Sequence, residues 1–196
     1  MSIKMRGSSR VFVGSLLIFR YNMKKREDGM SCMSEERMDQ SASMELLVPW
    51  SHEELEEVKN LFLQYEKSIG INLCFQGFQE EMATLPGKYQ EPQGVLILLN
   101  IKGEAAGCCA LRPLDDRICE LKRLYVKEEH RRRGLSKILM ERILKEAKEK
   151  GYERIRLDTL ETMKPAIQLY RSYGFQEISP YIYNPLPEAL YFEKIL

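Results

Sequence analysis

Hydrophobic positions recur along the chain with two different periods, which predict a mixed α/β domain from residue 44 onward. The stretch "MELLVPW" reads as a short first strand, and Ser51 with Glu54 then forms an S-x-x-E capping box. A stripe at helical spacing follows and predicts a helix that Gly70 ends: Leu55, Val58, Phe62, Tyr65 and Ile69.

The rest of the chain predicts alternating strands and helices. In chain order, the expected elements are a short helix near Gln79–Thr84, a hairpin of Val95–Ile101 and Ala105–Leu111, a strand at Ile118–Val126, a helix over 135–147, a strand at Arg154–Thr159, a helix over 166–173, and strands near Gln176–Tyr181 and Ala189–Leu196. Several strands therefore precede one strand–helix–strand unit, which favours a mixed sheet.

The first 43 residues differ from the rest, because seven of the ten methionines lie within residues 1–44. The apolar segment Val11–Phe19 is too short to span a bilayer, which needs roughly 20 residues. Arg6 and Arg10 precede it as in a signal peptide, but no small-residue cleavage pattern follows. We expect residues 1–43 to be a disordered or loosely attached leader, with Met44 as an alternative start, and residues 44–196 to form one domain.

Composition narrows the class of protein without naming a function. The 196 residues are 44% hydrophobic and 30% charged, as in ordinary globular domains, and a net charge of +1 disfavours a protein that coats nucleic acid or an anionic membrane. The five cysteines form no CxxC pair and predict reduced, mostly buried thiols in a cytoplasmic protein. With two histidines and no Cys/His cluster, we expect no metal site.

Arg131, Arg132, Arg133 and Gly134 stand where a predicted strand turns into a helix. A helix N-terminus carries unpaired N–H groups and partial positive charge, so a basic turn with glycine favours anion binding. Residues 122–150 hold eleven Lys or Arg against five Asp or Glu, which concentrates positive charge here. A solvated basic helix cap is the alternative. The turn matches neither a Walker P-loop nor a Rossmann fingerprint.

The motifs around this turn resemble those of the GNAT N-acetyltransferase superfamily. In "RRRGLS", Arg131, Gly134 and Ser136 occupy the signature places of the R/Q-x-x-G-x-G/A pyrophosphate loop, and "AIQLYRSYGF" resembles the second signature, A-I-x-L-Y-x-x-x-G-F. The motif match covers Val95–Phe175, and the element order agrees from residue 44 to the end. Ser136 stands where the family usually has Gly or Ala, and Met163 where many members carry an Asn.

The resemblance implies a GNAT-like fold with a central mixed, mostly antiparallel sheet, whose splayed parallel strands are flanked by helices. Acetyl-CoA would lie between the strands Ile118–Val126 and Arg154–Thr159, without a metal. The strand end would bind its pantetheine arm and the basic turn its pyrophosphate. The implied cofactor-binding residues are Leu124, Tyr125, Val126, Arg131, Arg132, Arg133, Gly134, Leu135, Ser136 and Lys137.

The resemblance also implies an N-acetyltransferase that moves an acetyl group from acetyl-CoA to a primary amine by direct transfer in a ternary complex. Tyr170, in the second signature, is the candidate acid for the leaving thiolate, and a purely structural core tyrosine is the alternative. Glu120 matches the base of the histone acetyltransferase branch, with an ion pair to Lys122 or Arg112 as the alternative. Asp158 matches a glutamate of the ribosomal-protein acetyltransferase branch and is the other candidate base.

Other functions stay open at this point. A non-catalytic acyl-CoA-binding or sensing module fits the departures at Ser136 and Met163, whereas a nucleic-acid module built on "RRRG" lacks flanking aromatics and a long basic stripe. The acceptor is a small-molecule or peptide amine that no motif specifies, and we expect no nucleic-acid or membrane partner. Many relatives dimerise, so a homodimer is an alternative to a monomer. Further residues suited to line an acceptor site are Phe75, Phe78, Tyr89, Tyr173, Tyr181, Tyr183 and Asn184.

Overall fold

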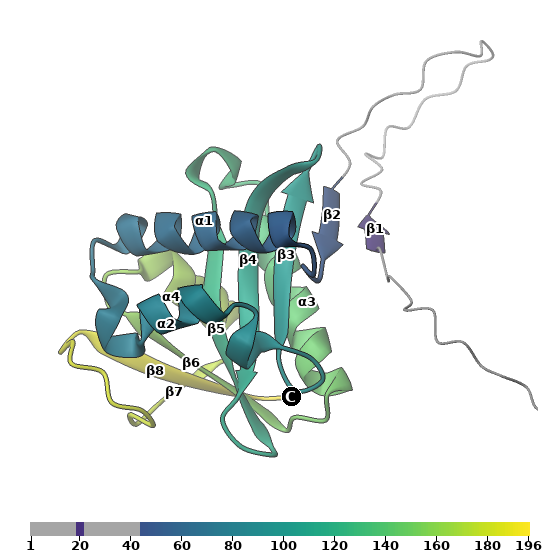
Figure 1. Ribbon diagram of the computed structural model, residues 1–196. Helices are drawn as coiled ribbons and strands as arrows, with labels where there is room; N and C mark the ends of the chain where they lie inside the picture. The colour runs from purple at the N-terminus through teal and green to yellow at the C-terminus, as the bar shows by residue number, and fades with distance from the viewer. Residues whose placement is uncertain (1–18, 22–43) are drawn as a thin grey trace, which may run out of the picture.

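The computed structural model describes residues 19–21 and 44–196, and their strands form one sheet in the order β1-β2-β3-β4-β5-β6-β8-β7 (Figure 1). The strands are β1 (Phe19–Tyr21), β2 (Met44–Leu47), β3 (Val95–Ile101), β4 (Glu104–Pro113), β5 (Ile118–Val126), β6 (Arg154–Leu160), β7 (Gln176–Ile178) and β8 (Ala189–Ile195). β5 and β6 pair in parallel, and all other neighbours are antiparallel. The predicted mixed, mostly antiparallel fold is confirmed.

Helices cover both faces of the sheet (Figure 1). The helices are α1 (His52–Ile69), α2 (Phe78–Thr84), α3 (Leu135–Glu149) and α4 (Lys164–Ser172), with 3-10 turns at Leu73–Gln76, Gly87–Tyr89 and Glu128–His130. Alternate residues of the strands pack against α1 and α2 on one face and against α3 and α4 on the other, which gives two buried clusters. The predicted capping box is present, because Glu54 N–H donates to Ser51 Oγ at 3.2 Å and Ser51 N–H to Glu54 Oε2 at 3.2 Å.

The central strand β5 is irregular in two ways. It pairs with β6 only through Ile118–Glu120, while β6 continues beside β8 as far as Leu160, so the two parallel strands separate. The register against β4 also shifts once, because Tyr125 lies opposite Cys108 but Lys122 lies opposite Ala110. One extra residue in β5 therefore forms a bulge, and Arg123 adopts a φ of 57° within it.

The C-terminal part differs from expectation in one element. The strand predicted near Gln176–Tyr181 ends at Ile178. Pro180 has no N–H for a strand ladder, and the chain leaves the sheet there. Residues 179–188 instead cross toward β5 and β6, where Tyr181 and Asn184 form hydrogen bonds with side chains of both strands.

Most of the predicted leader lies outside the described residues. Phe19–Tyr21 is the described part of it, and this segment pairs antiparallel with β2, with Phe19 opposite Leu46. The domain boundary at residue 44 stays a prediction. In residues 19–21 and 44–196, no helix has both the length and the apolar character needed to cross a bilayer.

Candidate active site

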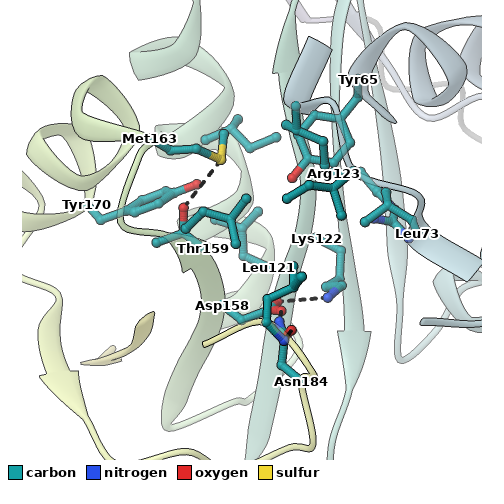
Figure 2. Close-up of a pocket in the computed structure, with 15 residues that line it drawn as sticks. Tyr65, Leu73, Leu121, Lys122, Arg123, Asp158, Thr159, Met163, Tyr170 and Asn184 are labelled. Carbon is teal, nitrogen blue, oxygen red and sulfur yellow. Dashed lines mark hydrogen bonds and ion pairs between the residues drawn. The ribbon is translucent and has the colours of Figure 1, made fainter. Parts of the chain in front are cut away.

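A cleft opens where β5 and β6 separate (Figure 2). It contains about 610 Å³ of space, part of which is open to solvent. The lining residues come from α1 and the turn after it, from both strands, from α4 and from the segment after β7: Tyr65, Ile69, Ile71, Leu73, Leu121, Lys122, Arg123, Leu124, Asp158, Thr159, Leu160, Met163, Tyr170, Asn184 and Leu186. The splayed strands implied by the family resemblance thus border a groove that is lined by side chains of both strands.

The basic turn presents a row of unpaired donors at the start of α3. Gly134, with a φ of 77°, precedes the helix, and no side chain caps it. In the part of the chain that the structure describes, the backbone N–H groups of residues 132–136 donate to no other backbone group. The side chains of Arg132 and Arg133 are exposed beside them. Unpaired N–H groups at a helix N-terminus, with added positive charge, suit the phosphate groups expected there.

Two of the predicted cofactor-binding residues, Arg131 and Lys137, form hydrogen bonds within the protein. Arg131 Nε donates to the Val126 carbonyl at 3.1 Å, and its guanidinium lies 5.8 Å from the centre of the Tyr125 ring. Arg131 therefore fastens the turn to the end of β5. The Lys137 N–H donates to the Gly134 carbonyl at 3.0 Å, so this amide belongs to the helix while the lysine side chain stays exposed.

The edge of β5 that faces the cleft carries the remaining predicted residues. Pairing with β6 ends at Glu120, so the β5 backbone beyond it has no strand beside it on that edge. Leu124 packs against the cluster under α3 and α4, while Tyr125 packs on the α1 face, with its ring 6.0 Å from that of Tyr65. An unpaired strand edge suits the amide groups of a pantetheine arm, which extends a sheet by hydrogen bonding.

Tyr170 is both a core residue and a cleft residue. Its ring packs 5.9 Å from Phe175 and 6.4 Å from Phe192, measured between ring centres. Its hydroxyl points from α4 into the cleft (Figure 2). Burial raises the pKa of Tyr170 well above its ordinary value, so the phenol keeps its proton at neutral pH and is able to donate it in a hydrogen bond.

Glu120 directly precedes two residues that line the cleft, and it is fully buried, with 0% of its side chain exposed. It accepts hydrogen bonds from Arg112 Nε at 2.6 Å and from the Tyr181 hydroxyl at 2.7 Å, and Lys122 Nζ is 3.9 Å away. The ion pair with Arg112 that the sequence left as an alternative is therefore present. Glu120 is not among the residues that line the cleft.

Asp158 is the carboxylate that lines the cleft. It accepts from Lys122 Nζ at 2.9 Å and from Asn184 Nδ2 at 3.2 Å (Figure 2). Burial alone would raise the pKa of Asp158, but the charge and hydrogen bond of Lys122, together with the Asn184 amide, hold it below its ordinary value. The structure therefore joins both candidate bases through one buried lysine.

The sequence interpretation missed Arg123 and the partners of Asp158, although it named Asn184 among residues suited to line an acceptor site and Lys122 as a possible ion-pair partner of Glu120. Arg123, in the β5 bulge, forms an ion pair with Glu81 of α2 at 2.7 Å, and it lies against the rings of Phe62, Tyr65 and Phe78. Lys122 and Asn184 bind Asp158. A charged residue inside an apolar strand is a signal for such pairs, but it does not identify the partner.

Met163 stands at the start of α4, where the resemblance would place an asparagine. Its sulfur accepts a hydrogen bond from Thr159 Oγ1 at 3.6 Å, and it lines the cleft between β6 and Tyr170. A thioether cannot donate a hydrogen bond, so the polar contact that the family motif offers here is absent from this residue. Within the described residues, no three His, Cys, Asp or Glu side chains gather as a metal site would require.

Comparison with known structures shows which proteins share this fold. An acetyltransferase from Streptococcus agalactiae matches with a TM-score of 0.68 and 22% identity, over 78% of this chain and 98% of its own. An N-acetyltransferase from Thermoplasma acidophilum, solved in complex with coenzyme A, matches with a TM-score of 0.62 and 18% identity, over 79% and 99%. The fold is thus that of acetyltransferases.

Comparison with known sequences shows the family. The model of the acetyltransferase (GNAT) family matches residues 37–175. An uncharacterized N-acetyltransferase of Schizosaccharomyces pombe is 37% identical over 141 residues, which are 71% of this chain and 86% of the relative. One from Dictyostelium discoideum is 31% identical over 206 residues, covering 74% and 95%. The chain belongs to the GNAT family and is an acyltransferase.

Proposed function

We propose that this protein transfers an acetyl group from acetyl-CoA to a primary amine, by direct transfer within a ternary complex. The observation that carries the proposal is the row of unpaired N–H groups at residues 132–136, placed just beyond the unpaired edge of β5. Together they offer donors for a diphosphate and a strand edge for an amide-containing arm. The coenzyme A complex of the T. acidophilum protein, which shares the fold, supports the same ligand class.

The residues present fit this cofactor. The N–H groups of 132–136 and the exposed arginines would hold the diphosphate, with Gly134 keeping the approach free of a side chain. Leu124 and Tyr125 on the β5 edge would hold the pantetheine arm. Bound there, acetyl-CoA supplies the activated acetyl group as a thioester.

Two proton transfers accompany the reaction. An alkyl amine has a pKa of about 10.4, so it arrives protonated and a base must take its proton. Asp158 lines the cleft and can do so directly, whereas Glu120, the base expected from the family motif, would act through Lys122. The Tyr170 phenol would donate its proton to the leaving sulfur.

Isothermal titration with acetyl-CoA tests the binding half of the proposal. Gly134→Ala is expected to weaken binding about tenfold, because an alanine Cβ disfavours a φ of 77° and shifts the neighbouring amides. Gly103→Ala is the matched control, since Gly103 has a φ of 81° and equally open surroundings in the β3–β4 turn. Equal binding by both variants would contradict the placement of the diphosphate.

Release of CoA across an amine panel, followed with a thiol reagent, tests the transfer half. The proposal expects amine-dependent release and a product heavier by one acetyl group. Binding of acetyl-CoA without release from any amine would favour a non-catalytic acyl-CoA sensor, the alternative that the departure at Met163 suggests.

A further inference from the structure

Lys122 is a buried cation that the protein itself only partly satisfies. Its side chain is 7% exposed and lines the cleft. An ammonium group has three N–H donors. Within the described residues one of them reaches Asp158 at 2.9 Å, while Glu120, at 3.9 Å, is beyond hydrogen-bond range. Buried charged donors are normally satisfied, so the unused donors indicate a ligand acceptor in the cleft.

The charges around Lys122 restrict what that ligand can be. Arg112 and Lys122 are positive, Glu120 and Asp158 are negative, and ion pairs link all four. The cluster is therefore neutral. A simple alkylammonium ion entering the cleft would add a positive charge beside Lys122, with no anion left to balance it. A zwitterion would bring both charges and keep the cluster neutral.

We propose that the amine acceptor is a free α-amino acid, whose carboxylate binds Lys122 while its amine faces Asp158. This inference rests on the acetyl transfer proposed above. Because Lys122 Nζ and Asp158 Oδ1 are 2.9 Å apart, the two groups that bind them must also be adjacent. An α-amino acid carries both groups on one carbon. A polyamine has no carboxylate, and the side-chain amine of a protein lysine is remote from one.

The two substrates would enter from opposite sides of the sheet. Leu121 and Leu157 face the cluster under α3 and α4, so Lys122 and Asp158, one position further along each strand, face the α1 side. The basic turn precedes α3, and Tyr170 reaches the cleft from α4. The amino acid would thus bind on the α1 side and the acetyl group on the α3–α4 side, so both can be bound at once, as direct transfer in a ternary complex requires.

The cleft wall also suggests the kind of amino acid. Four aliphatic side chains line the cleft: Ile69 at the end of α1, Ile71 and Leu73 just after it, and Leu186 in the segment after β7. These side chains carry no charge and suit an apolar side chain. The Asn184 amide, which binds Asp158, is a further polar group beside the expected amine.

The bonds and protons balance in this arrangement. The ammonium gives one proton to Asp158, its nitrogen forms a bond to the acetyl carbon, and the carbon–sulfur bond breaks. The sulfur takes the Tyr170 proton, and the second proton lost by the nitrogen restores Tyr170. The products are an N-acetylamino acid, CoA thiol and one proton passed to solvent. A carboxylate on Lys122 would also offset its charge and return the pKa of Asp158 toward its ordinary value, which makes Asp158 a better base.

The unmodified protein provides the first test, with three amines that share one side chain: L-leucine, L-leucinamide and 3-methylbutylamine. At saturating acetyl-CoA, we expect kcat/KM for L-leucine to exceed that of each of the others by about tenfold or more, the size of a charge-assisted hydrogen bond. Leucinamide has the less basic amine and more of its free form at neutral pH, so basicity cannot produce this order. Equal rates, or a preference for leucinamide, would overturn the inference.

Substitution of Lys122 provides the second test. Lys122→Met should remove the preference for L-leucine over L-leucinamide, and Lys122→Arg should keep most of it. Lys148→Met, an exposed lysine on α3, is the matched control and should behave as the unmodified protein. Unchanged acetyl-CoA binding by titration shows that each variant is folded. If Lys122→Met keeps a tenfold preference for the acid, Lys122 is not the carboxylate site.

The outcomes separate this inference from the proposed function. Release of CoA with spermidine but not with amino acids would overturn the acceptor class and leave acetyl transfer standing. Release with no amine of the whole panel, despite acetyl-CoA binding, would overturn acetyl transfer itself. If Lys122→Met does not fold, the substrate series with the unmodified protein decides.

Discussion

Replacing Glu81 with Gln tests the part of the structure that holds the β5 bulge in place. Glu81 accepts from Arg123 Nε at 2.9 Å and from Arg123 Nη2 at 2.7 Å. The two side chains are 12% and 2% exposed, so solvent cannot replace the lost charge. The substitution keeps the size of the side chain but leaves the guanidinium buried without its ion-pair partner.

The loss of folding free energy expected for Glu81→Gln follows from the burial of this ion pair. Breaking a buried ion pair by removing one partner costs about 3–5 kcal/mol, because an uncompensated charge remains inside the protein. For a chain of this length, each kcal/mol lowers the melting temperature by about 2–4 °C. We therefore expect Glu81→Gln to lower it by about 6–20 °C. Arg123→Met together with Glu81→Gln should cost less than the sum of the single changes, by about 1–3 kcal/mol.

Urea and thermal unfolding, followed by circular dichroism at pH 7, measure these differences. Glu80→Gln is the matched control, since Glu80 is an exposed neighbour on the same helix and should change stability by less than about 0.5 kcal/mol. A loss below about 1 kcal/mol for Glu81→Gln would refute the argument. So would additive effects in the double variant, because they would mean that Glu81 and Arg123 do not depend on each other.

The same pair makes stability depend on pH with a defined sign. Burial alone would raise the pKa of Glu81, but the hydrogen bonds and charge of Arg123 outweigh it and hold the pKa below its ordinary value. A carboxyl with a lowered folded-state pKa stabilises the protein above its unfolded pKa, about 4.3, and loses that contribution as pH falls through the folded value. The stability gap between the natural chain and Glu81→Gln should therefore be constant near neutral pH and shrink below about pH 4.

Three further predictions concern the cleft and the leader. Tyr170→Phe should lower kcat roughly 100-fold while the Kd for acetyl-CoA measured by titration stays unchanged, and an unchanged kcat would return Tyr170 to a packing role. In pH–rate profiles, the base is the residue whose neutral variant loses the fall of kcat/KM at acidic pH. We expect this loss for Asp158→Asn. If only Glu120→Gln loses that fall, Glu120 is the base, as the family motif implies. Deleting residues 1–43 should leave the melting temperature and kcat/KM unchanged, and a chain that fails to fold would show that the leader belongs to the domain.

Local patterns predicted the elements that frame the site. Capping at Ser51, the hairpin turn at Gly103 and the strand at Ile118–Val126 are set by neighbouring residues, so a pattern is sufficient to find them. The basic turn at Gly134 was also recognisable, because the order of arginines and glycine is local. The pairs Lys122–Asp158 and Arg123–Glu81 join residues 36 and 42 positions apart, and no local pattern specifies such partners.

The bulge in β5 explains why the sequence pattern did not predict which side chains face the cleft. Strict alternation from Cys119 and Leu121 would place Arg123 on the α3–α4 face and Leu124 beside Lys122. The extra residue puts Arg123 on the same face as Lys122, where Glu81 meets it, and returns Leu124 to the opposite core. One extra residue therefore reverses the sides of the β5 residues that follow it. Pairing between β5 and β6 ends at Glu120, just before this bulge, so the buried arginine lies beside the open cleft. For this reason, loosening the Arg123–Glu81 pair should disturb acetyl-CoA binding as well as stability, although neither residue belongs to the expected diphosphate site.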